Sequence, residues 1–354
     1  MTVADRCPFH VGSRASGALD AITDVAGVTV GHHTLDTHGI QTGVTVVRAH
    51  QGSHYLNRVP AAATVINGFG KSIGLMQLDE LGVLETPIAL TNTFSVPAVA
   101  TGQIQQALAN HPEIGRGWPT VNPLVFECND GYLNDIQAMC IEPKHYQQAF
   151  ESASTLFEQG AVGAGRGMSC FGLKGGIGSA SRLVSVASST YTVGALVLSN
   201  FGKLQNLLWL GQPLGKHLAQ QTGGPALQPP EKGSIIMLVA TDAPLDARQL
   251  RRLSGRAAAG LARTGSFFGH GSGDIALAFS TAYTVPALER EPMPTLALVH
   301  EQQLDGLFEA AAEATEQSII SSLWSAQSVV GRDGHRRQAL REVFDFEAVS
   351  GSSP

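Results

Sequence analysis

The sequence predicts a layered α/β protein. Strand-like apolar runs alternate with helical patterns along most of the chain, and glycines separate them. Glycine accounts for 40 of the 354 residues, whereas aromatic residues make up only 6%. Small residues of this kind let helices and strands approach closely, which suits stacked layers.

The individual elements follow from the hydrophobic periodicity in chain order. Short runs that alternate or are continuously apolar predict strands, and apolar residues three to four apart predict helices. Strands are expected at residues 24–30, 42–47, 61–66, 90–92, 121–128, 183–186 and 192–198, the last two as a pair. Helices are expected at residues 73–84, 97–109, 143–159 and 246–263, with Asp246 as the N-cap of the last helix and Gly265 after its end.

One long break interrupts this pattern between Gly211 and Gly233. The segment is rich in Gln, Gly and Pro and has no hydrophobic period, so we expect it to lack regular structure. It is followed at once by SIIMLVA, residues 234–240, a continuous apolar run typical of a central strand buried on both faces. An unstructured segment therefore ends at a serine that begins a buried strand.

Charge and composition exclude several classes of function. The formal net charge is -6, and no basic stripe is available to neutralise phosphates, so no nucleic-acid partner is expected. One group of arginines has helical spacing and is interpreted as a solvated helix face: Arg248, Arg251, Arg252 and Arg256. No stretch is apolar for long enough to span a bilayer, and residues 1–18 lack the apolar core of a secretory signal.

The four cysteines are expected to be reduced thiols in a cytoplasmic protein. They contain no Cys-x-x-Cys pair, and a chain of this length does not need disulfides to stabilise its core. The twelve histidines lack metal-ligand spacing, and no His-Glu-x-x-His helix is present. Phosphate-loop and dinucleotide patterns fail at every glycine cluster, since the first glycine of the phosphate loop would fall at Val65. We therefore expect neither a metal nor a cofactor.

A nucleophile-elbow pattern occurs at Ser72. Residues 70–74, Gly-Lys-Ser-Ile-Gly, satisfy Gly-x-Ser-x-Gly between an expected strand and an expected helix. Asp and His residues follow in the order that an α/β-hydrolase triad requires. However, no His-Gly-Gly run precedes the motif, so a tight strand-to-helix turn is the favoured interpretation. An esterase that uses Ser72 stays open as the alternative.

Ser234 is the stronger candidate nucleophile. A serine hydroxyl needs a nearby base, and cleavage of the preceding peptide bond would create an α-amino group with a pKa of ~7.7–8.0 a few bonds away. Gly233 suits such a cleavage because glycine tolerates the strained backbone that attack on the preceding carbonyl requires. The residue would then carry its own base, as N-terminal nucleophiles do.

Long blocks of the chain resemble the L-aminopeptidase/D-esterase family, which includes the β-peptidyl aminopeptidases. The most specific block is residues 233–266, GSIIMLVATDAPLDARQLRRLSGRAAAGLARTGS. The other blocks are similar to family blocks in the same order: AITDVAGVTVGHHT, TGVTVV, INGFGKSIGL, ECNDGYLND, GRGMSCFGLKGGIGSAS, VLSNFG and HGSGDIALAFSTA. Together they cover nearly the whole chain.

The resemblance implies three residues around the nucleophile. Ser234 matches the serine that autoproteolysis exposes after Gly233. Ser272 and Asp274 match a Ser-Gly-acid pair that contacts the nucleophile and its α-amine, although some relatives have glutamate as the acid. The chemistry is sensible, since a carboxylate can hold the α-ammonium and a hydroxyl can relay a proton.

The resemblance also implies the residues that bind substrate. Asn200 matches a side-chain amide of the oxyanion hole, Glu127 a carboxylate that receives the substrate's free amino group, and Tyr132 a tyrosine lining that pocket. His270 lies close to Ser272 in sequence, but the resemblance gives it no role, so it is interpreted as structural.

The family implies an αββα sandwich similar to N-terminal nucleophile hydrolases. Residues 1–354 would form one structural domain, cut into chains 1–233 and 234–354 and assembled into a homo-oligomer, commonly a tetramer of such pairs. The expected activity is an aminopeptidase or amidase acting on small L-amino acid, D-alanyl or β-amino acid amides and esters. A self-processing acyltransferase is a further alternative, but the similar ornithine acetyltransferases are expected to use threonine, and Ser234 counts against this.

Overall fold

Two β-sheets carry the fold. A computed structural model describes residues 7–37, 39–221 and 233–345. The larger sheet has the order β13 (Val285–Pro286), β3 (Asn57–Gly68), β12 (Gly273–Ser280), β11 (Ser234–Thr241), β10 (Ser189–Asn200) and β9 (Gly176–Val186), with β4 (Val83–Leu84) paired to β3. The smaller sheet has the order β1 (Thr29–Thr37), β2 (Ile40–Arg48), β5 (Ile88–Asn92) and β6 (Val125–Cys128).

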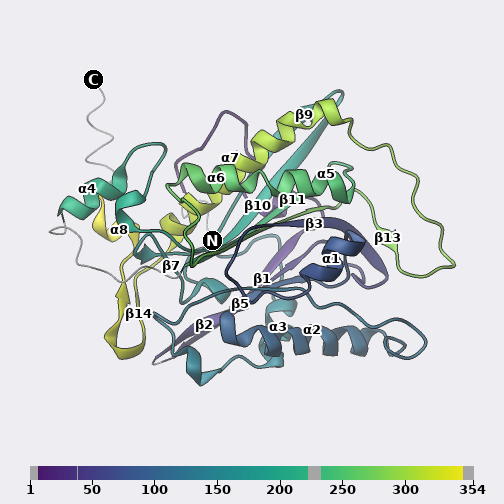
Figure 1. Ribbon diagram of the computed structural model, residues 1–354, viewed down its shortest axis with the longest axis horizontal. Helices are drawn as coiled ribbons and strands as arrows, with labels where there is room; N and C mark the ends of the chain where they lie inside the picture. The colour runs from purple at the N-terminus through teal and green to yellow at the C-terminus, as the bar shows by residue number, and fades with distance from the viewer. Residues whose placement is uncertain (1–6, 38, 222–232, 346–354) are drawn as a thin grey trace.

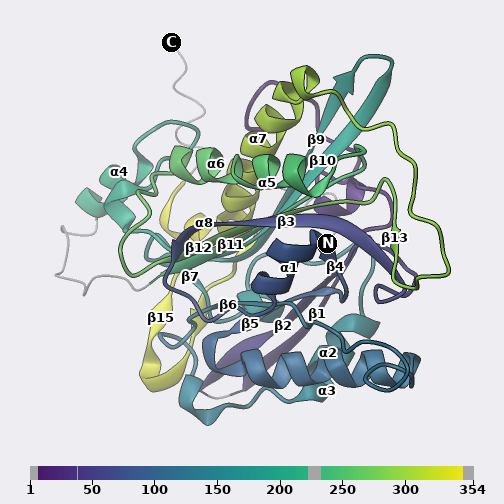
Figure 2. The same ribbon diagram turned by 45° about the vertical axis from the view of Figure 1, so that its right-hand side comes forward.

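Helices cover the outer face of each sheet. On the large sheet these are α5 (Ala247–Ser254), α6 (Ala257–Arg263) and α7 (Asp305–Ser325), and on the small sheet α2 (Val96–Asn110) and α3 (Pro143–Glu151). Figure 1 shows the four layers one above the other, with α5–α7 at the top and α2 and α3 at the bottom. The turned view in Figure 2 keeps the same order of layers. The expected αββα sandwich is therefore confirmed.

The remaining elements are short. They are the helices α1 (Leu75–Leu81), α4 (Leu214–Gln221) and α8 (Leu340–Val343), and the two-stranded ribbons β7 (Ser169–Cys170) with β8 (Leu173–Lys174) and β14 (Val329–Val330) with β15 (Arg336–Arg337). Single 3₁₀ turns lie at Ile22–Asp24, Thr93–Ser95, Ile136–Ala138, Gly163–Gly165, Leu204–Asn206, Glu301–Gln303 and Arg332–Gly334.

The central strand β11 explains how the layers are held together. All eight of its residues are buried, as its continuous apolar sequence predicts. Ile235 and Met237 belong to the core beneath α5–α7, whereas Ile236 and Leu238 belong to the core between the two sheets. A third core lies between the small sheet and α2 and α3. Alternate side chains of one strand thus join two of the three buried layers.

Most predicted strands are confirmed with shifted ends, and 183–186 and 192–198 lie in the antiparallel pair β9–β10. The prediction of a strand at 24–28 is wrong, because the chain turns there through a 3₁₀ turn and Gly27 at φ +88°. Helix 143–159 is too long in the prediction: α3 ends at Glu151, and Ser154 then pairs with Val30 in a bridge. Asp246 does cap its helix, which divides into α5 and α6.

The segment between Gly211 and Gly233 is only partly irregular. Residues 214–221 form α4, so the expectation that the whole segment lacks regular structure is wrong. Leu214 and Leu218 are buried on this helix and supply the apolar spacing that holds it against the protein. The rest of the segment, residues 222–232, lies outside the described residues.

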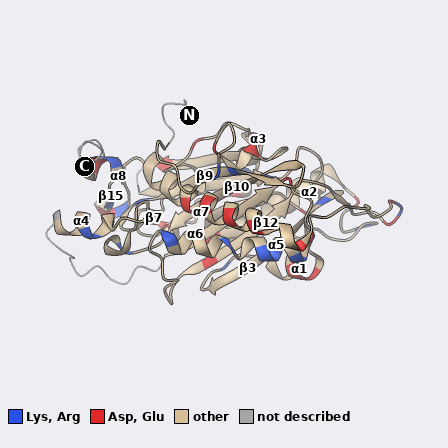
Figure 3. Ribbon diagram, turned by 90° about the horizontal axis from the view of Figure 1, so that it is seen from above, with Lys and Arg blue, Asp and Glu red and all other residues tan. Residues whose placement is uncertain are grey.

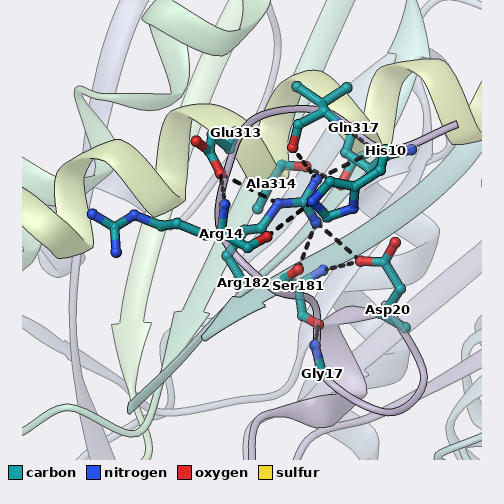
Figure 4. Close-up of polar contacts among 12 residues, drawn as sticks. His10, Arg14, Gly17, Asp20, Ser181, Arg182, Glu313, Ala314 and Gln317 are labelled. Carbon is teal, nitrogen blue, oxygen red and sulfur yellow. Dashed lines mark hydrogen bonds and ion pairs between the residues drawn. The ribbon is translucent and has the colours of Figure 1, made fainter. Parts of the chain in front are cut away.

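A buried arginine fastens the N-terminal segment to the large sheet. Arg182 of β9 donates to the Val11 carbonyl (2.7 Å) and to Asp20 (3.1 Å), and its Nε lies 3.5 Å from Glu313 of α7. Figure 4 shows these groups converging from the N-terminal segment, β9 and α7. Because Arg182 is fully buried and paired on both sides, the network ties three separate parts of the chain into one unit.

Of the four arginines expected on a solvated helix face, three lie on α5 and have acidic partners, whereas Arg256 follows α5 and its guanidinium lies 4.3 Å from the centroid of the Phe308 ring. Arg248 and Arg252 pair with Glu301, and Arg251 pairs with Asp79 of α1. Figure 3 shows basic segments of α5 close to acidic segments of α1 and α7. Among the described residues, no helix is both long enough and apolar enough to cross a bilayer.

Candidate active site

Ser234 occupies the first position of β11, between two neighbouring strands. Its register partners are Asn200, the last residue of β10, and Gly273, the first residue of β12. The preceding Gly233 is buried against the end of β10. A Cβ at this position would lie 2.5 Å from the Asn200 carbonyl oxygen and 2.7 Å from Phe201 Cα, so only glycine fits here without a shift of the backbone.

The Ser234 hydroxyl accepts a hydrogen bond from the Gly273 N–H at 3.1 Å. The two residues that flank Gly273 form a pair of their own, since Ser272 Oγ donates to Asp274 Oδ1 at 2.5 Å. Burial raises the pKa of the Asp274 carboxyl, and its Oδ2 has no hydrogen-bond partner within the described parts of the chain. The structure thus places Ser272 and Asp274 on either side of Gly273, and it is the Gly273 N–H that contacts the hydroxyl of the candidate nucleophile.

Asn200 is held in one orientation from both ends of its carboxamide. Its Oδ1 accepts from the Ser169 N–H at 2.8 Å, and its Nδ2 donates to the Asn129 carbonyl at 2.9 Å. One N–H of the amide is used in this way and the second remains to donate. Because Asn200 faces Ser234 across the ladder, a fixed neutral donor lies beside the candidate nucleophile.

Glu127 is a buried carboxylate at the end of β6. Its side chain is 3% exposed, Oε1 accepts from the Lys71 N–H at 2.7 Å, and Oε2 accepts from the Thr93 hydroxyl. A Cβ built on Gly70 would lie 3.5 Å from Glu127 Oε1 and 3.9 Å from Gly273 Cα. Glu127 is therefore separated from the Gly273–Ser234 hydrogen bond by little more than the width of one residue.

Tyr132 lies at the edge of this region and is 40% exposed. Its ring stacks on His335 with 4.7 Å between ring centroids, and the Arg337 guanidinium lies 3.6 Å from its centroid. Arg337 also donates to Ser169 Oγ at 3.0 Å. Arg337 of β15 thus connects Tyr132 to Ser169 of β7, whose N–H holds Asn200.

A cavity of about 340 Å³ opens beside Ser234. It is lined by Gly233, which precedes Ser234, and by Ser272, which precedes the Gly273 donor. Phe201 and Phe267 give it an apolar wall, and Lys203 and His270 add basic groups. The size of the cavity fits a small organic group.

The alternative nucleophile Ser72 lies in the turn between β3 and α1, as expected. Its hydroxyl oxygen is buried and has no hydrogen-bond partner among the described residues, so no described base activates it. Gly74 at the end of the motif has φ +91°, and a Cβ there would lie 2.3 Å from the Pro123 carbonyl. The motif is accounted for by this tight turn. His270 is exposed and packs near Phe69, with 6.3 Å between ring centroids.

Several groups at the site have no counterpart in the sequence analysis. They are the main-chain N–H of Lys71, Ser169 and Gly273, the carbonyl of Asn129 and the hydroxyl of Thr93. Main-chain donors carry no residue signature, so only their glycine-rich surroundings hint at a site. Thr93 follows Asn92, whose side chain caps the next turn, and the pattern alone indicates a helix start.

The chain is similar to known proteins over most of its length. Residues 20–337 match the family model described as Peptidase family S58. The chain is 38% identical over 347 residues to the Beta-peptidyl aminopeptidase BapA of Sphingosinicella microcystinivorans, covering 92% of this chain and 86% of that protein.

Two solved structures extend the comparison to the fold. The PH0078 protein from Pyrococcus horikoshii OT3 superposes with a TM-score of 0.90 at 46% identity, over 96% of both chains. The L-aminopeptidase D-Ala-esterase/amidase from Ochrobactrum anthropi, described as a new variant of the Ntn hydrolase fold, gives 0.88 at 31% identity, covering 98% of this chain and 96% of that one. With the fold, the serine at the head of β11 and these matches all in agreement, the chain belongs to peptidase family S58.

Proposed function

We propose that this chain is a self-processing serine aminopeptidase and amidase that cuts its own Gly233–Ser234 bond and then uses Ser234 as an N-terminal nucleophile. The observation that carries the proposal is the setting of Ser234. Its hydroxyl accepts from the Gly273 N–H at the head of a buried strand, opposite Asn200 and close to the buried Glu127. This combines a nucleophile, an oxyanion donor and an amine anchor within one site.

Self-processing begins with attack of Ser234 Oγ on the carbonyl carbon of Gly233. The bond from that carbon to the Ser234 nitrogen breaks, so the acyl group moves to the oxygen as an ester and the nitrogen becomes an α-amine. Water then hydrolyses the ester, which leaves a carboxylate on Gly233 and a hydroxyl on Ser234. The close packing of Gly233 against Asn200 and Phe201 supports this step because it fixes the backbone that is attacked.

Substrate turnover repeats this chemistry with the new α-amine as base. With a pKa of ~7.7–8.0 in an unperturbed chain, the amine accepts the hydroxyl proton near neutral pH as Ser234 attacks the substrate carbonyl. Asn200 donates to the oxyanion, and the leaving amine or alcohol departs with the proton. Water then releases the acyl group. Ser272 and Asp274 hold the α-ammonium and relay its proton.

Glu127 gives the site its preference for a free amino terminus. A carboxylate already held by the Lys71 N–H and Thr93 is a fixed partner for a substrate ammonium. The substrates would be amides, esters and short peptides with a small first residue, of the L-amino acid, D-alanyl or β-amino acid type, with Tyr132 lining the pocket. The names of the relatives, a Beta-peptidyl aminopeptidase and an L-aminopeptidase D-Ala-esterase/amidase, support this range.

The processed protein would be one structural domain built from chains 1–233 and 234–354, cytoplasmic and homo-oligomeric, as a tetramer of such pairs. Sedimentation velocity on the purified protein tests the assembly. A species with four times the mass of one processed pair is the expected result, and a single processed pair would contradict it.

The function is tested by intact mass and activity on the same samples. Wild type and Ser234→Ala are analysed under denaturing conditions and assayed with L-alanine p-nitroanilide, a β-homoamino acid p-nitroanilide and their N-acetylated forms. The wild type is expected as two fragments, the smaller beginning at Ser234, with activity on the free-amine substrates alone. Ser234→Ala is expected as one inactive chain.

Ser72→Ala serves as the matched control, since it removes the other candidate serine. It is expected to be cut and active like the wild type. An uncut wild type, or an inactive Ser72→Ala that is still cut, would overturn the proposal.

A further inference from the structure

Lys174 of β8 is fully buried in the loop region beside the candidate oxyanion hole. Its Nζ donates to three main-chain carbonyls, those of Gly165 (2.9 Å), Met168 (2.7 Å) and Gly175 (2.7 Å). Burial and the positive charges of Arg166 and Arg337 push the pKa of Lys174 down, and Cys170 and Asp130 act in the opposite direction. Since a neutral amine has only two hydrogens and the three carbonyls need three donors, the geometry corresponds to the ammonium.

One of these carbonyls belongs to the peptide that orients Asn200. The peptide group between Met168 and Ser169 accepts from Lys174 through its oxygen and donates to Asn200 Oδ1 through its N–H, at 2.8 Å. A cation that donates a hydrogen bond to the oxygen of an amide polarises the amide group. This strengthens the hydrogen bond that the N–H of the same amide makes. The buried ammonium is thus two hydrogen bonds away from the side chain that faces Ser234.

The other end of the Asn200 carboxamide is held by a second main-chain group, the Asn129 carbonyl. Oδ1 is held by the Ser169 N–H and Nδ2 by the Asn129 carbonyl. If the carboxamide rotated by half a turn, its NH₂ would face the Ser169 N–H and its oxygen would face the Asn129 carbonyl oxygen. Only one orientation satisfies both partners. Lys174 strengthens the Ser169 side of this arrangement, which is the side that determines where the amide nitrogen lies.

We propose that Lys174 is a positioning residue for the reaction: through the Met168–Ser169 peptide it fixes and polarises the Asn200 carboxamide that donates to the oxyanion. This rests on the proposed function, in which Asn200 stabilises the charge that develops when Ser234 attacks. Lys174 touches neither the substrate nor the reacting atoms. Its removal therefore lowers the rate of the chemical step and leaves substrate binding, which depends on Glu127, largely unchanged.

The test is a double-mutant cycle between Lys174 and Asn200. Lys174→Met, Asn200→Ala and the double variant are assayed with an L-alanine amide substrate, and kcat is counted per cleaved chain as measured by intact mass. Lys174→Met alone is expected to lower kcat by at least ~10-fold, below the ~10²–10³-fold of losing the donor itself, with KM within about twofold. In the Asn200→Ala background the same substitution is expected to have no further effect, because its route to the oxyanion is already gone.

A purely structural role for Lys174 predicts a different pattern. The fold-losses in kcat would then multiply in the double variant, or KM would rise as kcat falls. Either result overturns the proposal, as does an unchanged kcat. Lys174→Gln, which keeps two N–H donors, replaces Lys174→Met if the latter fails to fold, and it is expected to retain more activity. Lys144→Met, at an exposed lysine, is the matched control.

Ser234→Ala in the same series separates this proposal from the one on which it rests. An active Ser234→Ala would overturn both. An inactive Ser234→Ala together with multiplying losses would overturn only the role of Lys174.

Discussion

Asn200 and Ser234 face each other at the end of the antiparallel ladder between β10 and β11. Directly opposite residues of neighbouring strands point to the same side of a sheet. Leu198 and Ile236, two residues further into the ladder, lie in the core between the sheets, so this side faces the small sheet and the end of β6 that carries Glu127. The pairing places the candidate amide donor beside the candidate nucleophile, on the side of the large sheet that faces the small sheet.

Replacing the Asn200 amide by a carboxylate of the same shape tests its part in this arrangement. Asn200→Asp removes both amide N–H donors and is expected to lower kcat by ~10²–10³-fold with a smaller change in KM. Steady-state kinetics on cleaved enzyme measure the effect. Gln105→Glu makes the equivalent change at an exposed position of α2 and is expected to be neutral. An Asn200→Asp enzyme of normal kcat would contradict an oxyanion role.

The hydroxyl of Thr93 supports the amine anchor. Thr93→Val keeps the shape of the side chain but removes the hydrogen bond to Glu127 Oε2. Hydrogen bonds to charged groups contribute ~1.5–3 kcal/mol, so KM for free-amine substrates is expected to rise about 10–100-fold. Thr101→Val, at an exposed threonine of α2 that bonds the Pro97 carbonyl, is the control. An equal rise of KM in both variants would show that the effect is not specific to Glu127.

Gly70 lies between Glu127 and Gly273 and limits the room for the first residue of the substrate. A methyl group here meets only ordinary contacts, the nearest being Glu127 Oε1 at 3.5 Å, so Gly70→Ala is expected to fold normally. It should lower kcat/KM by about tenfold or more, since one methylene in a pocket is worth ~1–3 kcal/mol. Gly255→Ala, between α5 and α6, is the control. Equal kinetics for the two variants would place substrate elsewhere.

Asp130 makes the stability of the protein depend on pH. Burial raises the pKa of this carboxyl to about 7 from an unfolded value of 3.8, so between these pH values the folded state holds a proton that the unfolded chain has lost. The contribution of the protonated Asp130 to the free energy of unfolding is therefore full below about pH 4. It falls as the pH rises and levels off above about pH 7. The Tm difference between Asp130→Asn and wild type should become more positive from pH 5 to pH 8. Scanning calorimetry measures it, with exposed Asp135→Asn as control, and a flat difference would contradict the shift.

The sequence points to Ser234 as the candidate nucleophile because its signal is local. A serine after an irregular segment and before SIIMLVA is visible in one stretch of chain, and the structure places Ser234 at the head of a strand buried on both faces. Asn200, Glu127 and Tyr132 depend on the family resemblance, since each alone is an ordinary turn, surface or core residue. The structure adds the partners of Asn200 and Glu127, which include main-chain groups far away in sequence.

The longest helix, α7, is not predicted from the sequence, and its packing explains why. No element is predicted at residues 305–325, where α7 forms. The helix packs on β9, β10 and α6, so even Glu313, Glu316 and Gln317 are buried. A helix covered on nearly all sides has no polar face and therefore no apolar stripe to detect. Its Ala, Ser and Thr residues suit close packing but carry no periodic signal.

The order of strands in the large sheet determines how the two polypeptides would be held together after the proposed cleavage. β11 and β12 lie between β10 and β3, so a cut before Ser234 assigns the two inner strands to one polypeptide and both of their neighbours to the other. Neither polypeptide would keep the complete large sheet. Separating them would break the ladders of β10 with β11, of β12 with β3 and of β13 with β3, and would open two cores at once. If the chain is cut before Ser234 as proposed, we therefore expect a permanent heterodimer, whose two polypeptides neither separate on dilution nor exchange between molecules without unfolding.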